Sequence, residues 1–165
     1  MRPFIVVVTL VVLACAEDNQ SVFHSGRPAP SSEPNTVDAI RELVLRDLIS
    51  HDSDQARVAG TSACFISFEK NPDPPQAFLD RLTGACALVR PWSQLAAAGG
   101  PVRSSPTGGT RISFNVGSIH WRTNSEADLE AGYNCGSLCS AAYQYRVRWT
   151  ASGWVVDEAT MMWIS

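Results

Sequence analysis

Apolar residues recur at helical spacing in the segment 36–50. The apolar stripe contains Val37, Ile40, Leu43, Val44 and Leu48. This pattern is typical of a helix that packs one side against a core. Thr36 is a suitable N-cap, so we expect the helix and the folded domain to begin there. On the polar side, the spacing of Glu42 and Arg46 favours an ion pair along the helix.

Apolar and polar residues alternate through the segment 111–165, which predicts β-strands. The apolar positions of the successive strands are Ile112, Phe114 and Val116; Ile119 and Trp121; Ala127, Leu129, Ala131 and Tyr133; Tyr143, Tyr145, Val147 and Trp149; Trp154 and Val156. A change of phase at Gly117 indicates a bulge. Short links predict an antiparallel meander whose apolar side the helix covers. The predicted fold class is α+β: an N-terminal helix packed on a curved antiparallel sheet whose last four strands form a meander.

The region between the helix and the meander contains shorter elements. We expect a strand at 63–69 and an extended segment at 85–91. A short helix is predicted between them, with Asp73 as its cap and Pro74 at its first position. The segment 99–110 is rich in glycine and is expected to be a mobile loop. It lacks the spacing of a phosphate-binding loop, which disfavours a nucleotide cofactor, and no other cofactor motif is present.

The first fifteen residues have the order of an export signal: Arg2, an apolar run over 4–14, and then Cys15. The apolar run is shorter than the roughly 20 residues that a membrane-spanning helix needs. Val12-Leu13-Ala14-Cys15 resembles the lipobox of bacterial lipoproteins. The resemblance implies a signal peptide at 1–14, lipidation of Cys15 and anchoring in a membrane. Ala16, in place of aspartate, favours the periplasmic side of the outer membrane. Cleavage after Ala16 is the alternative, and it would produce a soluble periplasmic or secreted protein.

The charge of the mature chain is mildly negative. Of 13 basic and 16 acidic residues, Arg2 leaves with the predicted signal, so 12 basic and 16 acidic residues remain. A nucleic-acid-binding protein would show a basic patch, so this balance argues against one. The polar, proline-containing segment after the lipidated cysteine predicts a disordered tether over 15–35. The remaining residues, 36–165, suit a single domain.

Four cysteines remain in the predicted domain: Cys64, Cys86, Cys135 and Cys139. An even set of cysteines in an exported chain indicates disulfide bonds. Three pairings are possible, and we favour Cys64–Cys86 with Cys135–Cys139. A metal site is the less favoured alternative, with Cys135, Cys139 and His120 as ligands.

The polar side of the predicted meander carries complementary charges. If the turns centre near residues 124, 137 and 151–152, a row across the strands contains His120, Asp128, Arg146 and Asp157. Glu126 and Arg148 would form a neighbouring pair. These residues are candidates for binding an anion or a ligand or for moving a proton. We favour a salt-bridge ladder on a solvent-facing sheet, and a slip of one residue would displace every member.

The order of elements over 37–165 resembles the cone-shaped α+β folds of NTF2-like and cystatin-like proteins. The closing pattern that carries the resemblance is Tyr143-x-Tyr145-x-Val147-x-Trp149, followed by Gly153-Trp154-x-Val156. NTF2-like enzymes carry an acid and a tyrosine in a concave pocket. The resemblance therefore implies that Tyr133, Tyr143 or Tyr145 faces such a pocket, although we identify no acid of matching parity.

No catalytic motif is found in the sequence, and no catalytic residue is assigned. We therefore favour a non-catalytic domain of the cell envelope that binds a protein or a small apolar ligand. One alternative is an NTF2-like pocket enzyme, a hydrolase or an isomerase. Another is an inhibitor or immunity protein that presents the loop 99–110 or 134–139 to its target.

Acylation of Cys15 is directly testable. We expect the intact mass of the protein from its native envelope to correspond to residues 15–165 with three acyl chains. The other four thiols should resist alkylation until reduction, because they form disulfides. A chain that starts near Glu17 without lipid would contradict the anchor, and free Cys135 and Cys139 would favour the metal site.

Overall fold

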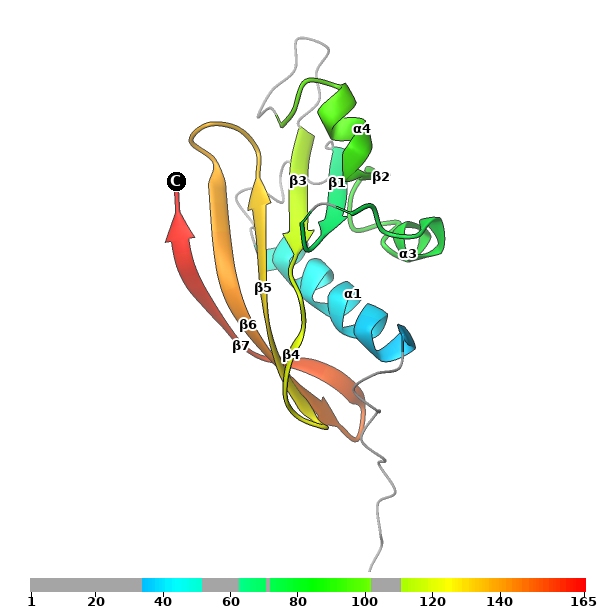
Figure 1. The fold of residues 1–165 in the computed structure, drawn as a ribbon, viewed down its shortest axis with the longest axis vertical. Helices are drawn as coiled ribbons and strands as arrows, with labels where there is room; N and C mark the ends of the chain where they lie inside the picture. The colour runs from blue at the N-terminus through cyan, green and yellow to red at the C-terminus, as the bar shows by residue number, and fades with distance from the viewer. Residues whose placement is uncertain (1–33, 52–62, 71, 102–110) are drawn as a thin grey trace, which may run out of the picture.

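The computed structural model describes residues 34–51, 63–70, 72–101 and 111–165, which form a mixed seven-stranded sheet and three helices (Figure 1). The predicted signal peptide, Cys15, most of the tether and most of the loop 99–110 lie outside these ranges. The elements are α1 (Pro34–His51), β1 (Ala63–Phe68), α3 (Gln76–Arg81), β2 (Leu88–Pro91), α4 (Trp92–Ala97), β3 (Arg111–Val116), β4 (His120–Thr123), β5 (Glu126–Asn134), β6 (Ser140–Thr150) and β7 (Gly153–Ile164).

The strand order is β2-β1-β3-β5-β6-β7, and β4 pairs with β5 beside this path. From β3 to β7 every pair is antiparallel, as the alternation predicts. The expectation of a wholly antiparallel sheet is wrong for β1, which pairs with β2 and β3 in parallel. Helices α3 and α4 interrupt the chain between these strands. Such crossover connections return the chain in its original direction, which produces parallel pairing.

The bulge predicted at Gly117 is confirmed, and it divides the first strand of the meander into β3 and β4. Val116 lies opposite Ala131, and His120 lies opposite Asp128. Residues 117–119, between β3 and β4, therefore lie opposite only residues 129–130 of β5. The backbone N–H of Gly117 donates to the Glu130 carbonyl at 2.7 Å, so the ladder is maintained through the extra residue.

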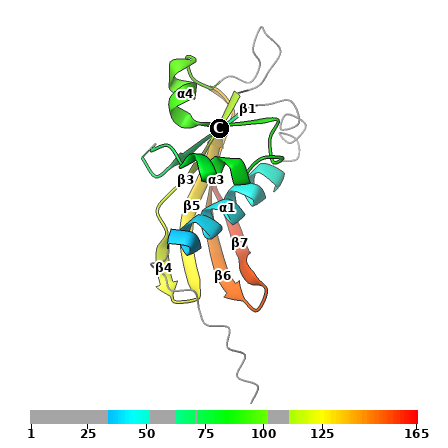
Figure 2. The same cartoon turned by 90° about the vertical axis from the view of Figure 1, so that its right-hand side faces the viewer.

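Helix α1 covers one side of the antiparallel run, as its apolar stripe predicts. Figure 2 shows α1 lying across the strands, with the short helix α3 beside it. The buried residues of α1 share one core with the sheet. This core includes Ile40, Val44, Leu45 and Leu48 from α1, Phe78, Leu79 and Leu82 from α3 and its C-terminal end, and Ile66, Val116, Leu129, Tyr145 and Val147 from the strands. Burial of these side chains is the main force that holds helix and sheet together.

Ion pairs fix α1 against α3 at the rim of the core. Arg81 bonds Glu42 at 2.8 Å and Asp38 at 3.4 Å. The predicted Glu42–Arg46 pair is confirmed at 3.0 Å. Partial burial acts to raise the pKa of Glu42, but hydrogen bonds from Arg81 and Arg46 outweigh it and lower the pKa.

The starts of both predicted helices differ from expectation. Helix α1 begins at Pro34, and Thr36 is buried inside its first turn rather than at the N-cap. Proline is favoured at the first helical position because it has no N–H to leave unpaired.

Asp73 does not cap α3, which begins only after Pro75. The reason is that Pro75 disfavours helical backbone at the residue before it. The Asp73 carboxylate instead accepts a hydrogen bond from the backbone N–H of Ser93 at 2.9 Å. Asp73 therefore caps the first turn of α4, a helix that the alternation pattern does not predict.

Both favoured disulfides are present. Cys64–Cys86 joins β1 to the segment before β2, with 6.1 Å between the Cα atoms. Cys135–Cys139 closes the connection from β5 to β6, with a Cα separation of 5.2 Å. Two such bonds indicate an oxidising, exported compartment. Among the described helices, none combines the length and the apolar character that crossing a bilayer requires.

Candidate functional site

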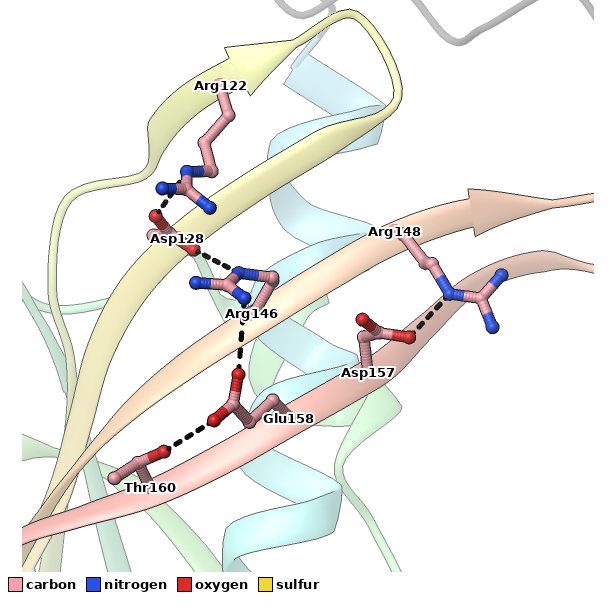
Figure 3. A network of polar contacts seen from close by, with 7 residues as sticks. All are labelled: Arg122, Asp128, Arg146, Arg148, Asp157, Glu158 and Thr160. Carbon is pink, nitrogen blue, oxygen red and sulfur yellow. Dashed lines mark hydrogen bonds and ion pairs between the residues drawn. The ribbon is translucent and has the colours of Figure 1, made fainter.

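A row of charged residues crosses the side of the sheet that points away from α1 (Figure 3). The predicted register is correct over most of this row. His120 lies opposite Asp128, Asp128 lies opposite Arg146, and Glu126 lies opposite Arg148. These pairings follow from the antiparallel connections, which keep residues of one parity on one side of the sheet.

Asp157 does not occupy the position predicted for it. The register between β6 and β7 shifts next to Arg146, so that Arg146 lies opposite Glu158. One extra residue in β7 at this point displaces Asp157 to a neighbouring position. The Asp157 carboxylate bonds Arg148 at 2.5 Å instead.

Part of the charged row forms a connected chain of ion pairs that begins at Arg122, a residue that the sequence pattern did not indicate, and Arg148 with Asp157 forms a separate pair. Asp128 accepts from Arg122 at 3.0 Å and from Arg146 at 3.3 Å. Arg146 also bonds Glu158 at 3.2 Å, and Thr160 donates to Glu158 at 3.1 Å. Each arginine in these pairs therefore has an acidic partner, and the arginine side chains are 39–50 % exposed. The arrangement therefore has the character of a surface salt-bridge ladder.

The residues considered for a metal site do not form one in this structure. Cys135 and Cys139 are bonded to each other, so neither sulfur is a free thiolate. His120 is exposed on β4. Within the described ranges, no group of three or more histidine, cysteine or carboxylate side chains has the proximity that a metal ion needs.

A pocket of about 380 Å³ lies between α1 and the strands β6 and β7. Its lining includes Asp47 and Leu48 from α1, Tyr143 and Tyr145 from β6, and Val156, Asp157, Glu158 and Ala159 from β7. Asp157 and Glu158 are paired with Arg148 and Arg146. Asp47 is therefore the carboxylate that the helix itself contributes to a mostly aromatic and aliphatic cavity.

Tyr145 is buried, with 1 % of its surface exposed. Burial raises the pKa of Tyr145 well above its usual range, because an ionised phenolate would lose its hydration. The negative charge of Asp47, the hydrogen bond to Asp47 and the neighbouring Tyr143 raise this pKa further. The Tyr145 hydroxyl is thus neutral at physiological pH and donates a hydrogen bond to Asp47.

Asp47 is the site residue that the sequence analysis missed. It follows Val44 by three residues and Leu43 by four, which places it on the apolar stripe of α1. Asp47 could have been recognised from the sequence as an acidic residue on the apolar side of a helix. Of the three candidate tyrosines, Tyr143 and Tyr145 line the pocket, whereas Tyr133 packs near Phe114, with 6.4 Å between ring centroids.

Comparison with protein-family models, curated proteins and solved structures finds no match to this chain. The function must therefore be argued from the geometry of the site.

The pairing of Tyr145 with Asp47 has a consequence for stability. At neutral pH, Tyr145→Phe should lower the unfolding free energy by roughly 1–3 kcal/mol, because a buried hydrogen bond to a carboxylate is lost. Above the ordinary tyrosine pKa of 10.0, the unfolded wild type releases a proton that the folded state retains. Wild-type stability should then fall with rising pH, and the difference from the variant should narrow.

Denaturant unfolding at neutral pH and near pH 11 measures the unfolding free energies of the wild type and of Tyr145→Phe. A difference that stays constant between these two conditions would contradict the raised pKa of Tyr145.

Arg146 joins two acidic partners in the salt-bridge ladder, whereas Arg148 has one. Removal of the charge by Arg146→Gln should lower the unfolding free energy by roughly 0.2–1 kcal/mol for each pair, and 1 M salt should reduce this loss. Arg148→Gln is the matched control and should cost less. A loss that exceeds about 2 kcal/mol or that is independent of salt would show that the ladder is more than a surface network.

Proposed function

We propose that this protein is a lipid-anchored binding module of the cell envelope and that its pocket receives a small, largely apolar ligand carrying a positive charge. The observation that carries this proposal is the position of Asp47 in the cavity between α1 and the sheet. A cavity of about 380 Å³ falls in the range of small-molecule sites. Such sites are mainly apolar and have few polar groups that fix orientation.

The chemistry of the lining favours an amine over an alcohol or an acid. Leu48, Val156 and Ala159 offer aliphatic contact, and the rings of Tyr143 and Tyr145 can attract a cation. The Asp47 carboxylate can accept a charge-assisted hydrogen bond from an ammonium group. A ligand carboxylate would instead be repelled by the negative charge of Asp47.

The predicted export signal supports a location in the envelope. Lipid on Cys15 would anchor the chain, and the tether 15–35 would separate the domain from the membrane. The lack of aspartate after Cys15 favours the outer membrane. The disulfides agree with export. A soluble periplasmic or secreted form is the alternative if cleavage follows Ala16.

The likeness to NTF2-like and cystatin-like folds rests on a helix that covers an antiparallel sheet. Two register shifts between β6 and β7 are of the kind that bend strands, which supports a curved sheet. An acid and a tyrosine in the covered pocket agree with this likeness, with Asp47 and Tyr145 in these roles.

A pocket enzyme is the second candidate, and the pairing of Asp47 with Tyr145 is the observation that favours it. The carboxylate could accept a proton from a substrate, as a hydrolase or an isomerase requires. The neutral Tyr145 hydroxyl donates to Asp47 itself, which leaves a developing oxyanion without a donor from Tyr145. Binding without turnover is therefore the favoured function.

Three probes with the same six-carbon chain test the ligand class: hexylamine, 1-hexanol and hexanoate. We expect hexylamine to bind most tightly, as measured by shifts of the Leu48 and Val156 methyl resonances at neutral pH. Asp47→Asn should weaken hexylamine binding roughly tenfold, because a charged hydrogen bond is lost, and should leave hexanol binding unchanged.

Asp38→Asn is the matched control, since it removes the same charge from α1 outside the pocket. Equal weakening by both variants would mean that Asp47 has no specific role. Hexanoate binding as tight as that of hexylamine would contradict a cation site.

A further inference from the structure

The two edges of the sheet differ in how they are protected. At one edge, β2 has only four residues, contains Arg90 and ends at Pro91. Short length, charge and proline all discourage a further strand from pairing. At the other edge, β7 has twelve residues, and within the described part of the chain no strand pairs with its outer side.

The end of β7 is unusually apolar for an exposed strand. Residues 159–164 read Ala-Thr-Met-Met-Trp-Ile, without charge, proline or glycine. Met161, Met162 and Trp163 are 48–51 % exposed, and Ile164 is 66 % exposed. Leu138, 84 % exposed, belongs to the turn that adjoins this end. We call residues 159–164 together with Leu138 the apolar edge.

Backbone hydrogen bonds hold the components of the apolar edge together. Ser140 and Ser165 exchange two of them, at 3.2 and 2.8 Å, and these attach the end of β7 to the start of β6. The Cys135–Cys139 disulfide closes the turn that carries Leu138. The apolar edge is thus a supported surface with a row of backbone N–H and C=O groups along it.

We propose that the apolar edge pairs with the same edge of a second copy of this chain, antiparallel, about a twofold axis near Met161. The two sheets would then form one continuous sheet. A twofold contact of this kind uses the same surface on both partners, so the surface must be complementary to itself.

The charges along β7 support self-pairing and restrict its register. Asp157 and Glu158 precede the uncharged segment, and an axis close to them would place carboxylates opposite carboxylates. Like charges directly opposite each other destabilise a strand pair. An axis at Met161 places residues 159–163 of one copy opposite residues 163–159 of the other and Glu158 opposite Ile164, so no carboxylate faces another carboxylate. The occupant that fits the apolar edge is therefore an uncharged apolar strand, which the second copy supplies.

The area available suits a dimer of moderate strength. Five side chains about half exposed or more leave on the order of 100 Å² each, so two copies would bury at most about 1,000 Å² of side-chain surface. This value is near the lower limit for specific interfaces. Main-chain hydrogen bonds between the paired edges would add to it, as they do when a peptide joins a sheet edge.

Sedimentation velocity on the purified full chain with intact disulfides tests the proposal. We expect a dimer at tens of micromolar. Met161→Lys and Met161→Glu should each raise the dimer dissociation constant more than about tenfold, because two like charges meet at the axis. An equal mixture of these two variants should recover the dimer as a heterodimer, since opposite charges then meet. Leu88→Lys on β2 is the control, because Leu88 is 44 % exposed at the other edge; it should leave the dimer intact.

Three results would overturn the proposal: a monomeric wild type throughout this concentration range, a dimer that persists in both Met161 variants, or a mixture that stays monomeric. The recovery in the mixture separates loss of the interface from misfolding, because misfolded chains would not regain a dimer. Capture of a different protein along β7 by a chain that is itself monomeric would show that the apolar edge serves another partner.

Discussion

The packing of α1 on the antiparallel run is the contact on which the rest of the structure depends. It buries the apolar side of the sheet and, by doing so, assigns the other side to water. It also decides where each polar residue of α1 lies. Arg81 and its two acidic partners hold the helix at its rim, while Leu45 and Leu48 are enclosed in the core. Asp47 lines the pocket because Val44 and Leu48, its neighbours on the same helix, pack into this interface.

The cost of placing a carboxylate in an apolar interface is offset locally. A buried charge without hydrogen bonds is strongly unfavourable. Tyr145 supplies a donor to Asp47 from the opposing strand, and the pKa of that phenol is raised first by its burial and then by Asp47. An arrangement that only stabilised the fold would be served as well by an apolar residue at this position. The presence of an acid beside a cavity is therefore the feature that most favours the proposed ligand binding.

Charged side chains are distributed unevenly over the sheet, with many on the open face and none at the end of β7. On the open face, the arginines of the ladder, Arg122, Arg146 and Arg148, each have an acidic partner on a neighbouring strand and remain partly exposed to solvent. The bulge in β7 shows how one residue can redirect this network: Glu158 takes the place opposite Arg146, and Asp157 turns to Arg148. At its C-terminal end, over residues 159–164, the same strand carries no charge. Charges at a strand edge discourage pairing with another strand, whereas an uncharged, exposed edge allows it.

Local pattern is sufficient for the existence of the first helix, for the strands of the meander, for the bulge at Gly117 and for the register that places Glu126 opposite Arg148, because each depends on near neighbours and short turns. The sequence by itself also determined both disulfides as the favoured pairing. Only the tertiary structure decided that β1 runs parallel to its neighbours, because direction depends on how distant crossovers return the chain. It alone placed Asp47 against Tyr145, 98 residues apart in sequence, and moved Asp157 out of the predicted row. These outcomes depend on the orientation of a helix on a sheet and on one extra residue in a strand, and neither is encoded in local periodicity.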